Sequence, residues 1–159
     1  MASDPQLVEQ LNVAFREFVP HNKALGLTVV DVDGLKLTLA LPWNDRLIGD
    51  PESGVLHGGA ITTLLDACCG ASVYVRLQDP QPIATLDLRV DFLGRAPTRR
   101  EVRATAECHH VTSSVAFVRG VAFIDDPAKP FAIATATFAL STQGRAVTLD
   151  QVLKGSELA

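Results

Sequence analysis

The chain has 159 residues, of which 47% are hydrophobic and 20% are charged, and its formal net charge at pH 7 is -4. That length supports one well-formed hydrophobic core and is too short for two ordinary domains. The 14 Lys and Arg residues are scattered along the chain, so we expect no basic patch for a phosphate backbone and no nucleic-acid partner. No basic segment followed by an apolar run opens the sequence, and no uninterrupted apolar stretch is long enough to cross a bilayer. We therefore expect a cytoplasmic protein with no membrane partner.

The cysteines do not form a convincing metal site. Cys68 and Cys69 are adjacent, and on a helix they point about 100° apart, so they cannot hold one ion together. Cys108, His109 and His110 look more like a cluster, but neighbours on a strand face opposite sides of a sheet, and no further ligand pair stands nearby. The sequence predicts reduced, buried cysteines and no metal.

The first predicted element is an amphipathic helix over residues 5–18, where apolar side chains recur every three or four positions. This pattern stops at Pro20, and residues 25–32 are predicted to form a strand. The pair Asp33-Gly34 then gives a strong hairpin signal, and a second strand follows in which leucines alternate with other residues.

A long helix is predicted over about residues 58–76. The stretch 43–53 is rich in Asn, Asp, Gly, Pro and Ser, which favours a loop that leads into this helix. The helix should stop before Asp79-Pro80, because proline disfavours helical geometry in the residue ahead of it. One stripe of the helix is expected to face a sheet, and it contains Ile61, Leu64, Leu65, Cys68 and Ser72.

Four long strands are predicted after the helix, over residues 83–92, 100–110, 115–124 and 131–141. They are enough to wrap around one apolar helix. The sequence therefore predicts an α+β fold, in which a curled antiparallel β-sheet, ending in a four-strand meander, encloses one long central helix. We expect three parts: an N-terminal helix over 1–19, the main domain over 20–142, and a C-terminal tail over 143–159.

Asp66 is the residue of the long helix that fits its surroundings least. It is a lone carboxylate in an apolar run, and burying a carboxylate is unfavourable because the charge loses its hydration. On the helix it lies beside the apolar stripe, in a row of mostly small residues that leaves room for a ligand or another backbone. The alternative is a carboxylate that only accepts a hydrogen bond from a threonine or a neighbouring loop.

The start of the same helix offers a second chemical element. The backbone N–H groups of Gly58 and Gly59 would be exposed at a helix N-terminus, where they favour negative charge, including that of a developing oxyanion. Gly58 and Asp66 are eight residues apart, which is about 12 Å along a helix and beyond the reach of a carboxylate side chain. If both act on one carbon, the acid must come from a second copy across a two-fold axis, which predicts a homodimer.

The motif His57-Gly58-Gly59, with an acid nine positions after the histidine and Gly54-Val55-Leu56 before it, resembles that of the PaaI-type acyl-CoA thioesterases of the hotdog superfamily. The resemblance covers roughly residues 20–141 and implies the hotdog fold. It also implies that the Gly58 N–H polarises a thioester carbonyl, and that Asp66 of the other subunit attacks this carbonyl or activates a water. By the same resemblance, His57 orders the helix start and the hydroxyl of Thr85 assists.

The resemblance further implies an acyl-CoA substrate with a small aromatic or a short or medium acyl group. It implies no cofactor apart from the coenzyme A of the substrate, and a homodimer or homotetramer with sites at the subunit interface. Several relatives carry Asn or Gln six residues before the histidine, where this chain has Pro51 preceded by Asp50. Asp50 is therefore a candidate for placing the water or the leaving group. Candidates for binding the coenzyme A portion are Gly59, Gly94, Arg95, Ser113 and Ser114.

Two other functions stay open at this point. A non-catalytic acyl-CoA sensor would need a partner module or a DNA-binding module, and no such appendage is apparent in the sequence. An enoyl-CoA hydratase-like enzyme on the same fold would use a histidine as its base. The Gly-Gly helix start, with an acid two and a half turns later, fits that enzyme poorly.

Overall fold

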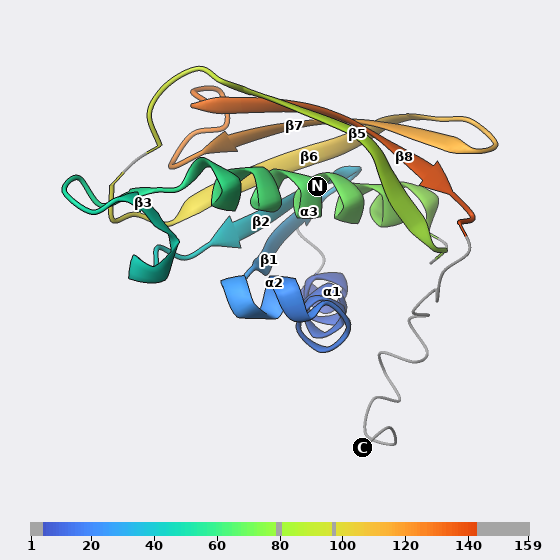
Figure 1. Cartoon of the computed structure of the whole chain (residues 1–159). Helices are drawn as coiled ribbons and strands as arrows, with labels where there is room; N and C mark the ends of the chain where they lie inside the picture. The colour runs from blue at the N-terminus through green and yellow to red at the C-terminus, as the bar shows by residue number, and fades with distance from the viewer. Residues whose placement is uncertain (1–4, 79–80, 97, 143–159) are drawn as a thin grey trace.

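A six-stranded antiparallel sheet curls around one long helix (Figure 1). The computed structural model describes residues 5–78, 81–96 and 98–142, so the predicted tail over 143–159 lies outside the described residues. The elements in chain order are α1 (Pro5–Phe18), α2 (Pro20–Leu25), β1 (Thr28–Asp33), β2 (Lys36–Leu41), η1 (Asp45–Leu47), β3 (Ile48–Asp50), β4 (Val55–Leu56), α3 (Gly58–Leu77), β5 (Ile83–Phe92), β6 (Val102–Val111), β7 (Val115–Phe123) and β8 (Ala132–Leu140).

The strand order in the sheet is β1-β2-β6-β7-β8-β5. The α+β fold with a curled sheet around the helix is confirmed, but the prediction of a four-strand meander is wrong in one respect. Strand β6 pairs with β2 rather than with β5, so that Leu41 lies opposite Val102. Strand β5 instead takes the free side of β8, where Ile83 lies opposite Leu140. The two outer strands of the sheet are therefore β1 and β5.

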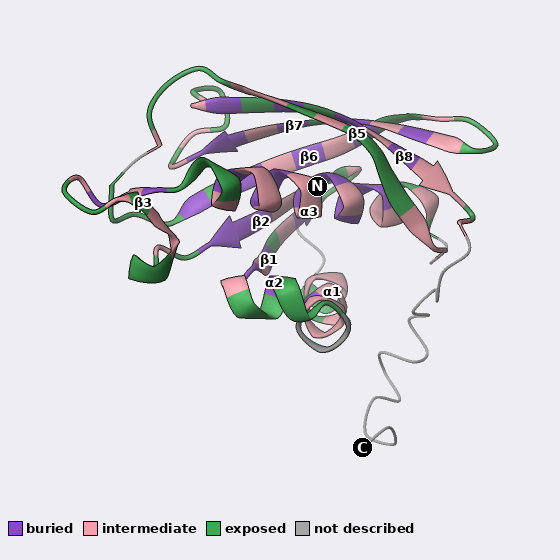
Figure 2. Ribbon diagram, viewed as in Figure 1, coloured by how far each residue is buried: buried purple, intermediate pink, exposed green. Residues whose placement is uncertain are grey.

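Helix α3 fills the concave side of this sheet, and its buried side faces the strands (Figure 2). The predicted stripe is confirmed, because each of its members is 0% exposed: Ile61, Leu64, Leu65, Cys68 and Ser72. By length and composition alone α3 could cross a membrane. Its packing against β2, β6 and β7 accounts for that apolar character as the core helix of this domain.

The three cysteines are free and buried, as predicted. Burial, together with the negative charge of Asp66, raises the pKa of Cys69 to about 12. The helix approaches the sheet closely at this point, because a Cβ atom on Gly120 of β7 would lie 3.2 Å from the Cys69 Sγ. The Cys69 thiol is therefore a neutral packing group beneath Asp66.

The segment before β1 differs from its prediction. Residues Pro20–Leu25 form the short helix α2, and β1 begins only at Thr28. Pro20 suits a first helical turn, and Gly26 ends the helix in the left-handed conformation, with φ of 70°. The predicted loop over 43–53 also holds more structure than expected, since it contains η1 and most of the two-stranded sheet β3-β4.

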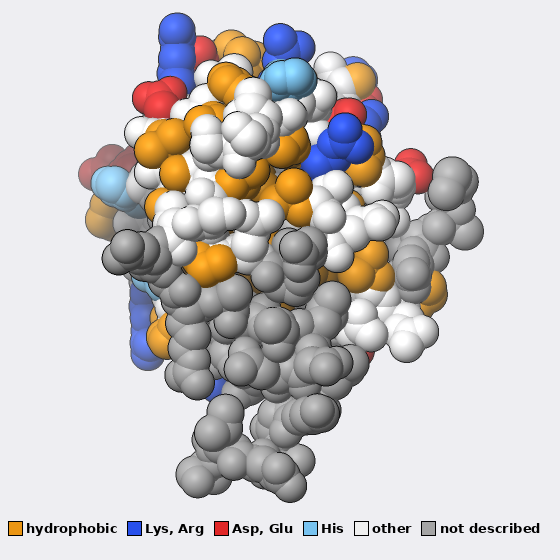
Figure 3. Space-filling view, turned by 90° about the vertical axis from the view of Figure 1, so that its right-hand side faces the viewer, with side chains coloured by type: hydrophobic (Ala, Val, Ile, Leu, Met, Phe, Trp, Pro, Cys, Tyr) orange, Lys and Arg blue, Asp and Glu red, His pale blue; other side chains and the backbone are white. Residues whose placement is uncertain are grey.

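Basic side chains are dispersed over the surface that Figure 3 presents. The Lys and Arg residues visible there lie apart, with hydrophobic and other side chains between them. The described residues on this face thus show no continuous basic patch.

Asn12 attaches α1 to the edge strand β1. Its side-chain amide donates to the Val29 carbonyl oxygen at 2.9 Å, and its Oδ1 accepts from the Val29 N–H at 2.7 Å. Asn12 is only 8% exposed. One buried side chain therefore satisfies both backbone groups of a residue on an outer strand of the sheet, as a neighbouring strand would.

We predict that Asn12→Leu destabilises the protein by about 1–3 kcal/mol, because it leaves the Val29 N–H and C=O buried without a partner. Urea unfolding followed by circular dichroism measures this free energy. An unchanged unfolding midpoint would show that α1 does not depend on this pair of hydrogen bonds.

Candidate active site

The hairpin of β3 and β4 delivers the chain to the start of α3 and fixes His57 by its backbone. The His57 N–H donates to the Leu47 carbonyl oxygen at 2.8 Å. A Cβ atom on Gly49 would lie only 2.9 Å from the His57 Cα, so only glycine allows the hairpin to approach this closely. The turn residues ahead of the helix thus position the histidine.

His57 is the N-cap of α3. Its Nδ1 accepts a hydrogen bond from the Gly59 N–H at 2.9 Å, and its carbonyl oxygen accepts from the Ala60 N–H at the same distance. An added Cβ on Gly59 would lie 2.9 Å from this Nδ1. The cap therefore requires glycine at position 59. Because the Gly59 N–H is already bonded to His57, Gly59 has a structural role.

The Gly58 N–H takes no part in the His57 cap. Among the described residues none accepts a hydrogen bond from it, and Gly58 is exposed. An added Cβ on Gly58 would meet the ring of Phe92 at 3.5 Å, an ordinary contact. The helix start therefore presents one unpaired N–H, aligned with the positive end of the helix dipole, to a ligand.

Asp66 is half-buried on α3 and faces β5. Its Oδ1 accepts a hydrogen bond from the Thr85 hydroxyl at 3.0 Å, and its Oδ2 has no partner among the described residues. The pairing of β5 with β8 shifts register between Thr85 and Asp87, and a bulge of this kind redirects side chains at functional sites. The carboxylate is thus oriented through one oxygen while the other is available.

The acid and the helix start open into different cavities of one chain. Asp66 and Thr85 line a cavity of about 330 Å³. His57 and Gly59 line a neighbouring cavity of about 350 Å³. Because α3 runs unbroken from Gly58 to Leu77, the Gly58 donor and Asp66 are about 12 Å apart along its axis. One chain therefore does not bring the two groups onto one reacting atom.

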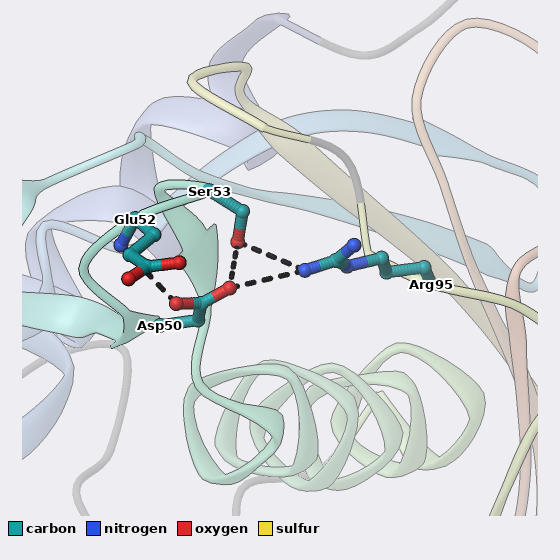
Figure 4. A network of polar contacts seen from close by, with 4 residues as sticks. All are labelled: Asp50, Glu52, Ser53 and Arg95. Carbon is teal, nitrogen blue, oxygen red and sulfur yellow. Dashed lines mark hydrogen bonds and ion pairs between the residues drawn. The ribbon is translucent and has the colours of Figure 1, made fainter.

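Asp50 and Arg95 belong to one exposed network (Figure 4). The Ser53 hydroxyl donates to the Asp50 carboxylate, and the Arg95 guanidinium contacts Asp50 Oδ2 at 3.1 Å and the Ser53 Oγ at 2.9 Å. The hydrogen bonds from the Ser53 side chain and the Glu52 N–H, with the nearby Arg95 charge, lower the pKa of Asp50. The two predicted site residues thus bind each other and link the β3-β4 hairpin to the segment after β5.

The other predicted coenzyme A contacts lie at opposite ends of β5. Ser113 and Ser114 form the turn between β6 and β7, and the Ser114 carbonyl oxygen accepts from the Leu140 N–H at 2.8 Å, beside the first residue of β5. Gly94 is the second residue after β5, and its N–H donates to the Phe131 carbonyl oxygen at 3.1 Å. Ten strand residues separate these ends, a span of about 30 Å. One chain does not unite them in a single site.

The sequence analysis missed the residues before β1 that line the Asp66 cavity. Phe15 and Val19 contribute from α1 and the residue after it, while His21 and Asn22 contribute from α2. The aromatic residue on the apolar side of the predicted N-terminal helix was the available signal. Among the described residues, no group of three or more His, Cys, Asp or Glu side chains is placed to hold a metal ion.

Known proteins are similar to this chain over the residues that form the site. The thioesterase superfamily profile matches residues 53–131, the stretch that contains the His57 cap, Asp66 and Thr85. A crystal structure of a Pseudomonas aeruginosa protein is 45% identical, covers 84% of this chain and 98% of its own, and superposes with a TM-score of 0.75. The medium/long-chain acyl-CoA thioesterase YigI of Salmonella typhimurium is 28% identical over 146 residues, which cover 84% of this chain and 93% of YigI.

Other similarities are shorter or concern the fold alone. The Escherichia coli PaaI protein from the phenylacetic acid degradation operon is 17% identical and has a TM-score of 0.72, with 89% of this chain and 99% of PaaI covered. The chain spans 61% and 34% of the lengths of two further curated relatives, from Halobacterium salinarum and Pseudomonas aeruginosa.

The capped helix start and the oriented acid lie on a sheet curled around one helix, which is the hotdog fold. The chain belongs to the thioesterase superfamily, and its fold is that of the PaaI-type members.

We predict that Gly59→Ala is less stable than Gly58→Ala by about 1 kcal/mol, the usual worth of an N-cap. Both changes replace a glycine in the first helical turn by alanine, so the gain in helix propensity cancels in the comparison. Only Gly59→Ala pushes a methyl group against the His57 Nδ1. Chemical denaturation of the two variants measures the difference, and equal stabilities would contradict the assigned cap.

Proposed function

We propose that this protein hydrolyses acyl-CoA thioesters to the free acid and coenzyme A. The observation that carries the proposal is the pair of unpaired groups on α3: the Gly58 N–H at its start and the Asp66 Oδ2 eight residues later. Membership in the thioesterase superfamily and the similarity to YigI support it. The preferred acyl group is a small aromatic or a short or medium chain, and no cofactor is required.

In this mechanism the thioester carbonyl oxygen accepts a hydrogen bond from the Gly58 N–H, which stabilises the oxyanion of the tetrahedral intermediate. Asp66 from the second subunit either takes a proton from the attacking water or attacks the carbonyl carbon itself. The C–S bond then breaks, and coenzyme A leaves as a thiolate that takes up a proton. Where Asp66 itself has attacked, a water then hydrolyses the acyl–Asp66 anhydride, which releases the free acid and restores the carboxylate. Thr85 acts through Asp66, whose Oδ1 it holds. His57 uses one ring nitrogen for the cap, which disfavours the hydratase alternative.

The outer edge of β5 is the surface on which we infer that two copies meet. Large apolar side chains are exposed on and just after this strand: Leu86 is 60% exposed, Phe92 48% and Leu93 59%. An open strand edge with exposed apolar residues is unfavourable in water unless another chain covers it. Phe92 also lies beside Gly58, so this edge adjoins the helix start.

Antiparallel pairing of two β5 strands across a two-fold axis would set the two α3 helices side by side in opposite directions. The start of β5 in one copy would then lie beside the end of β5 in the other. Ser113 and Ser114 of one copy and Gly94 and Arg95 of the other would flank the same seam, where we place the coenzyme A portion of the substrate. Pairing of such dimers into a tetramer and a cytoplasmic location stay predictions.

We predict that Asp66→Asn lowers kcat for acyl-CoA hydrolysis at least about 10²-fold, because the amide neither accepts a proton from water nor attacks the carbonyl. Release of free coenzyme A across a panel of acyl-CoA esters measures the rate. The matched control is Asp126→Asn, whose amide oxygen still accepts the Ala128 N–H and which should keep the parent rate. Near parental turnover by Asp66→Asn, with an unchanged sedimentation profile, would refute the assigned role.

The shared site is tested by a variant that deletes the backbone donor. Gly58 is the first helical residue, where proline is tolerated, and the extended ψ of 136° at His57 suits a residue before proline. We predict that Gly58→Pro lowers kcat about 10² to 10³-fold, and that Gly58→Ala, which keeps the N–H, loses less.

Heterodimers of Gly58→Pro and Asp66→Asn should then regain about half of the parent activity, because one of their two sites combines an intact donor with an intact acid. Co-expression of the variants with two different affinity tags isolates such heterodimers. Activity no higher than that of either single variant would place both groups in one chain and overturn the inferred seam.

A further inference from the structure

The β3-β4 hairpin positions the helix start, and other parts of the chain hold the hairpin. The Trp43 indole N–H donates to the Gly54 carbonyl oxygen at 3.1 Å. Val55 forms an antiparallel bridge with Thr98, a residue that follows β5. Thr98 comes so close that its Cγ2 would lie 3.4 Å from a Cβ atom on Gly54. The hairpin is therefore attached both to the loop after β2 and to the chain that follows β5.

Arg95 makes a second link between the hairpin and the chain after β5 (Figure 4). Its Nη2 contacts the Asp50 Oδ2 at 3.1 Å and the Ser53 Oγ at 2.9 Å. Because a guanidinium only donates, the Ser53 hydroxyl accepts from Arg95 and gives its own proton to Asp50. The Asp50 Oδ1 accepts the Glu52 N–H at 3.1 Å. Both carboxylate oxygens are thus engaged within this network, which favours a structural use of Asp50 over the placing of a water.

Stability alone does not account for the Arg95–Asp50 ion pair. The two side chains are 69% and 44% exposed, and ion pairs this accessible to water contribute little to stability. What distinguishes the pair is the distance along the chain that it spans, because its partners are 45 residues apart. The exposed pair of Arg103 and Glu101, in contrast, joins residues two positions apart. The main consequence of the Arg95–Asp50 pair is therefore geometric: it fixes the hairpin relative to β5.

The hairpin transmits this constraint to the start of α3. The Leu47 carbonyl oxygen accepts the His57 N–H at 2.8 Å, and Gly49 lies so close to His57 that an added Cβ would be 2.9 Å from the His57 Cα. The Phe92 ring at the end of β5 lies beside Gly58. A shift of the hairpin relative to β5 would therefore displace the Gly58 N–H. Misplacing a catalytic group by about 1 Å can lower a rate about 10²-fold.

We propose that Arg95 is a positioning residue for the oxyanion donor. By holding the β3-β4 hairpin to the chain after β5, Arg95 fixes the Gly58 N–H relative to the strand at which we place the second copy. Asp66 of that copy then meets the thioester carbonyl at the reacting distance. Arg95 acts through the hairpin and takes no part in bond breaking. The inference rests on the proposed hydrolysis and on the inferred seam at β5.

The kinetic test compares acyl-CoA esters with the corresponding thioesters of N-acetylcysteamine, which carry no phosphate. We expect Arg95→Gln to lower kcat about tenfold for both kinds of thioester, because a displaced Gly58 N–H affects the same reacting atoms in each. KM should change less than about threefold. A loss confined to the coenzyme A esters, or seen in KM alone, would make Arg95 a substrate-binding residue and overturn the proposal.

Three further variants distinguish positioning from a general surface effect. Arg95→Lys keeps a positive donor for Asp50 and Ser53 and should retain more activity than Arg95→Gln. Asp50→Asn combined with Arg95→Gln should lose no more than the more impaired single variant, because the two residues act as a unit. The matched control is Arg103→Gln, which removes a comparable exposed ion pair and should keep the parent rate. Additive losses, or an equal loss in Arg103→Gln, would contradict the proposal.

Trp43 provides a measurement that does not depend on hydrolysis. It is the chain's one tryptophan, and its indole bonds to Gly54, the residue after Ser53. Acrylamide quenching of its fluorescence should rise about twofold or more in Arg95→Gln, because a loosened segment exposes its side chains, and should not rise in Arg103→Gln.

The quenching experiment separates this proposal from the proposed hydrolysis. If the parent protein hydrolyses none of the thioesters, the proposed function fails, and quenching still tests the hold on the hairpin: a rise in Arg95→Gln would support it. Equal quenching in the parent and in Arg95→Gln would overturn it. Sedimentation of Arg95→Gln should match that of the parent, and dissociation into smaller species would make Arg95 an assembly residue and also overturn the proposal.

Discussion

The burial of one side of α3 against the curled sheet is the constraint on which the rest of the structure depends. Ile61, Leu64, Leu65 and Cys68 are completely inaccessible to solvent. Because a helix turns once every 3.6 residues, fixing this side also fixes where every other residue of α3 points. Asp66 is thereby turned toward Thr85 on β5, and the helix start is left at the surface. The core thus sets the direction of the two groups to which we assign the chemistry.

The two outer strands of the sheet differ in how they are covered, and this difference supports the proposal that two copies meet at β5. At β1, α1 packs along the strand, and Asn12 bonds both backbone groups of Val29. At β5, exposed Leu86 and Phe92 occupy the strand. An uncovered edge is an aggregation hazard that soluble proteins usually block. Blocking one edge and leaving the other apolar is the pattern expected of a chain that associates through β5.

Local signals made α3 and the long strands predictable, whereas long-range pairing did not. The start of α3 at Gly58 and the bounds of β5 were predicted correctly, because the His-Gly-Gly start and the β-branched alternation act within a few residues. The neighbour of β5 depends on contacts forty or more residues away. The same limit applies to the site. The spacing of residues on one helix was enough to predict Gly58 and Asp66 as site residues. The position of Asn22 at the Asp66 cavity, in contrast, depends on the folded helix α2.

Hydrogen bonding separates the structural polar groups from those we assign to the substrate. Folding pairs Gly59 with His57, Thr85 with Asp66 and Asn12 with Val29. It leaves over the Gly58 N–H and the Asp66 Oδ2, which have no hydrogen-bond partner among the described residues. Gly58 is exposed and Asp66 lines a cavity, so both groups are accessible to a ligand. Because α3 separates them by about 12 Å in one chain, the proposed mechanism assigns the two groups of one copy to two different substrates, each of which is completed by the second copy.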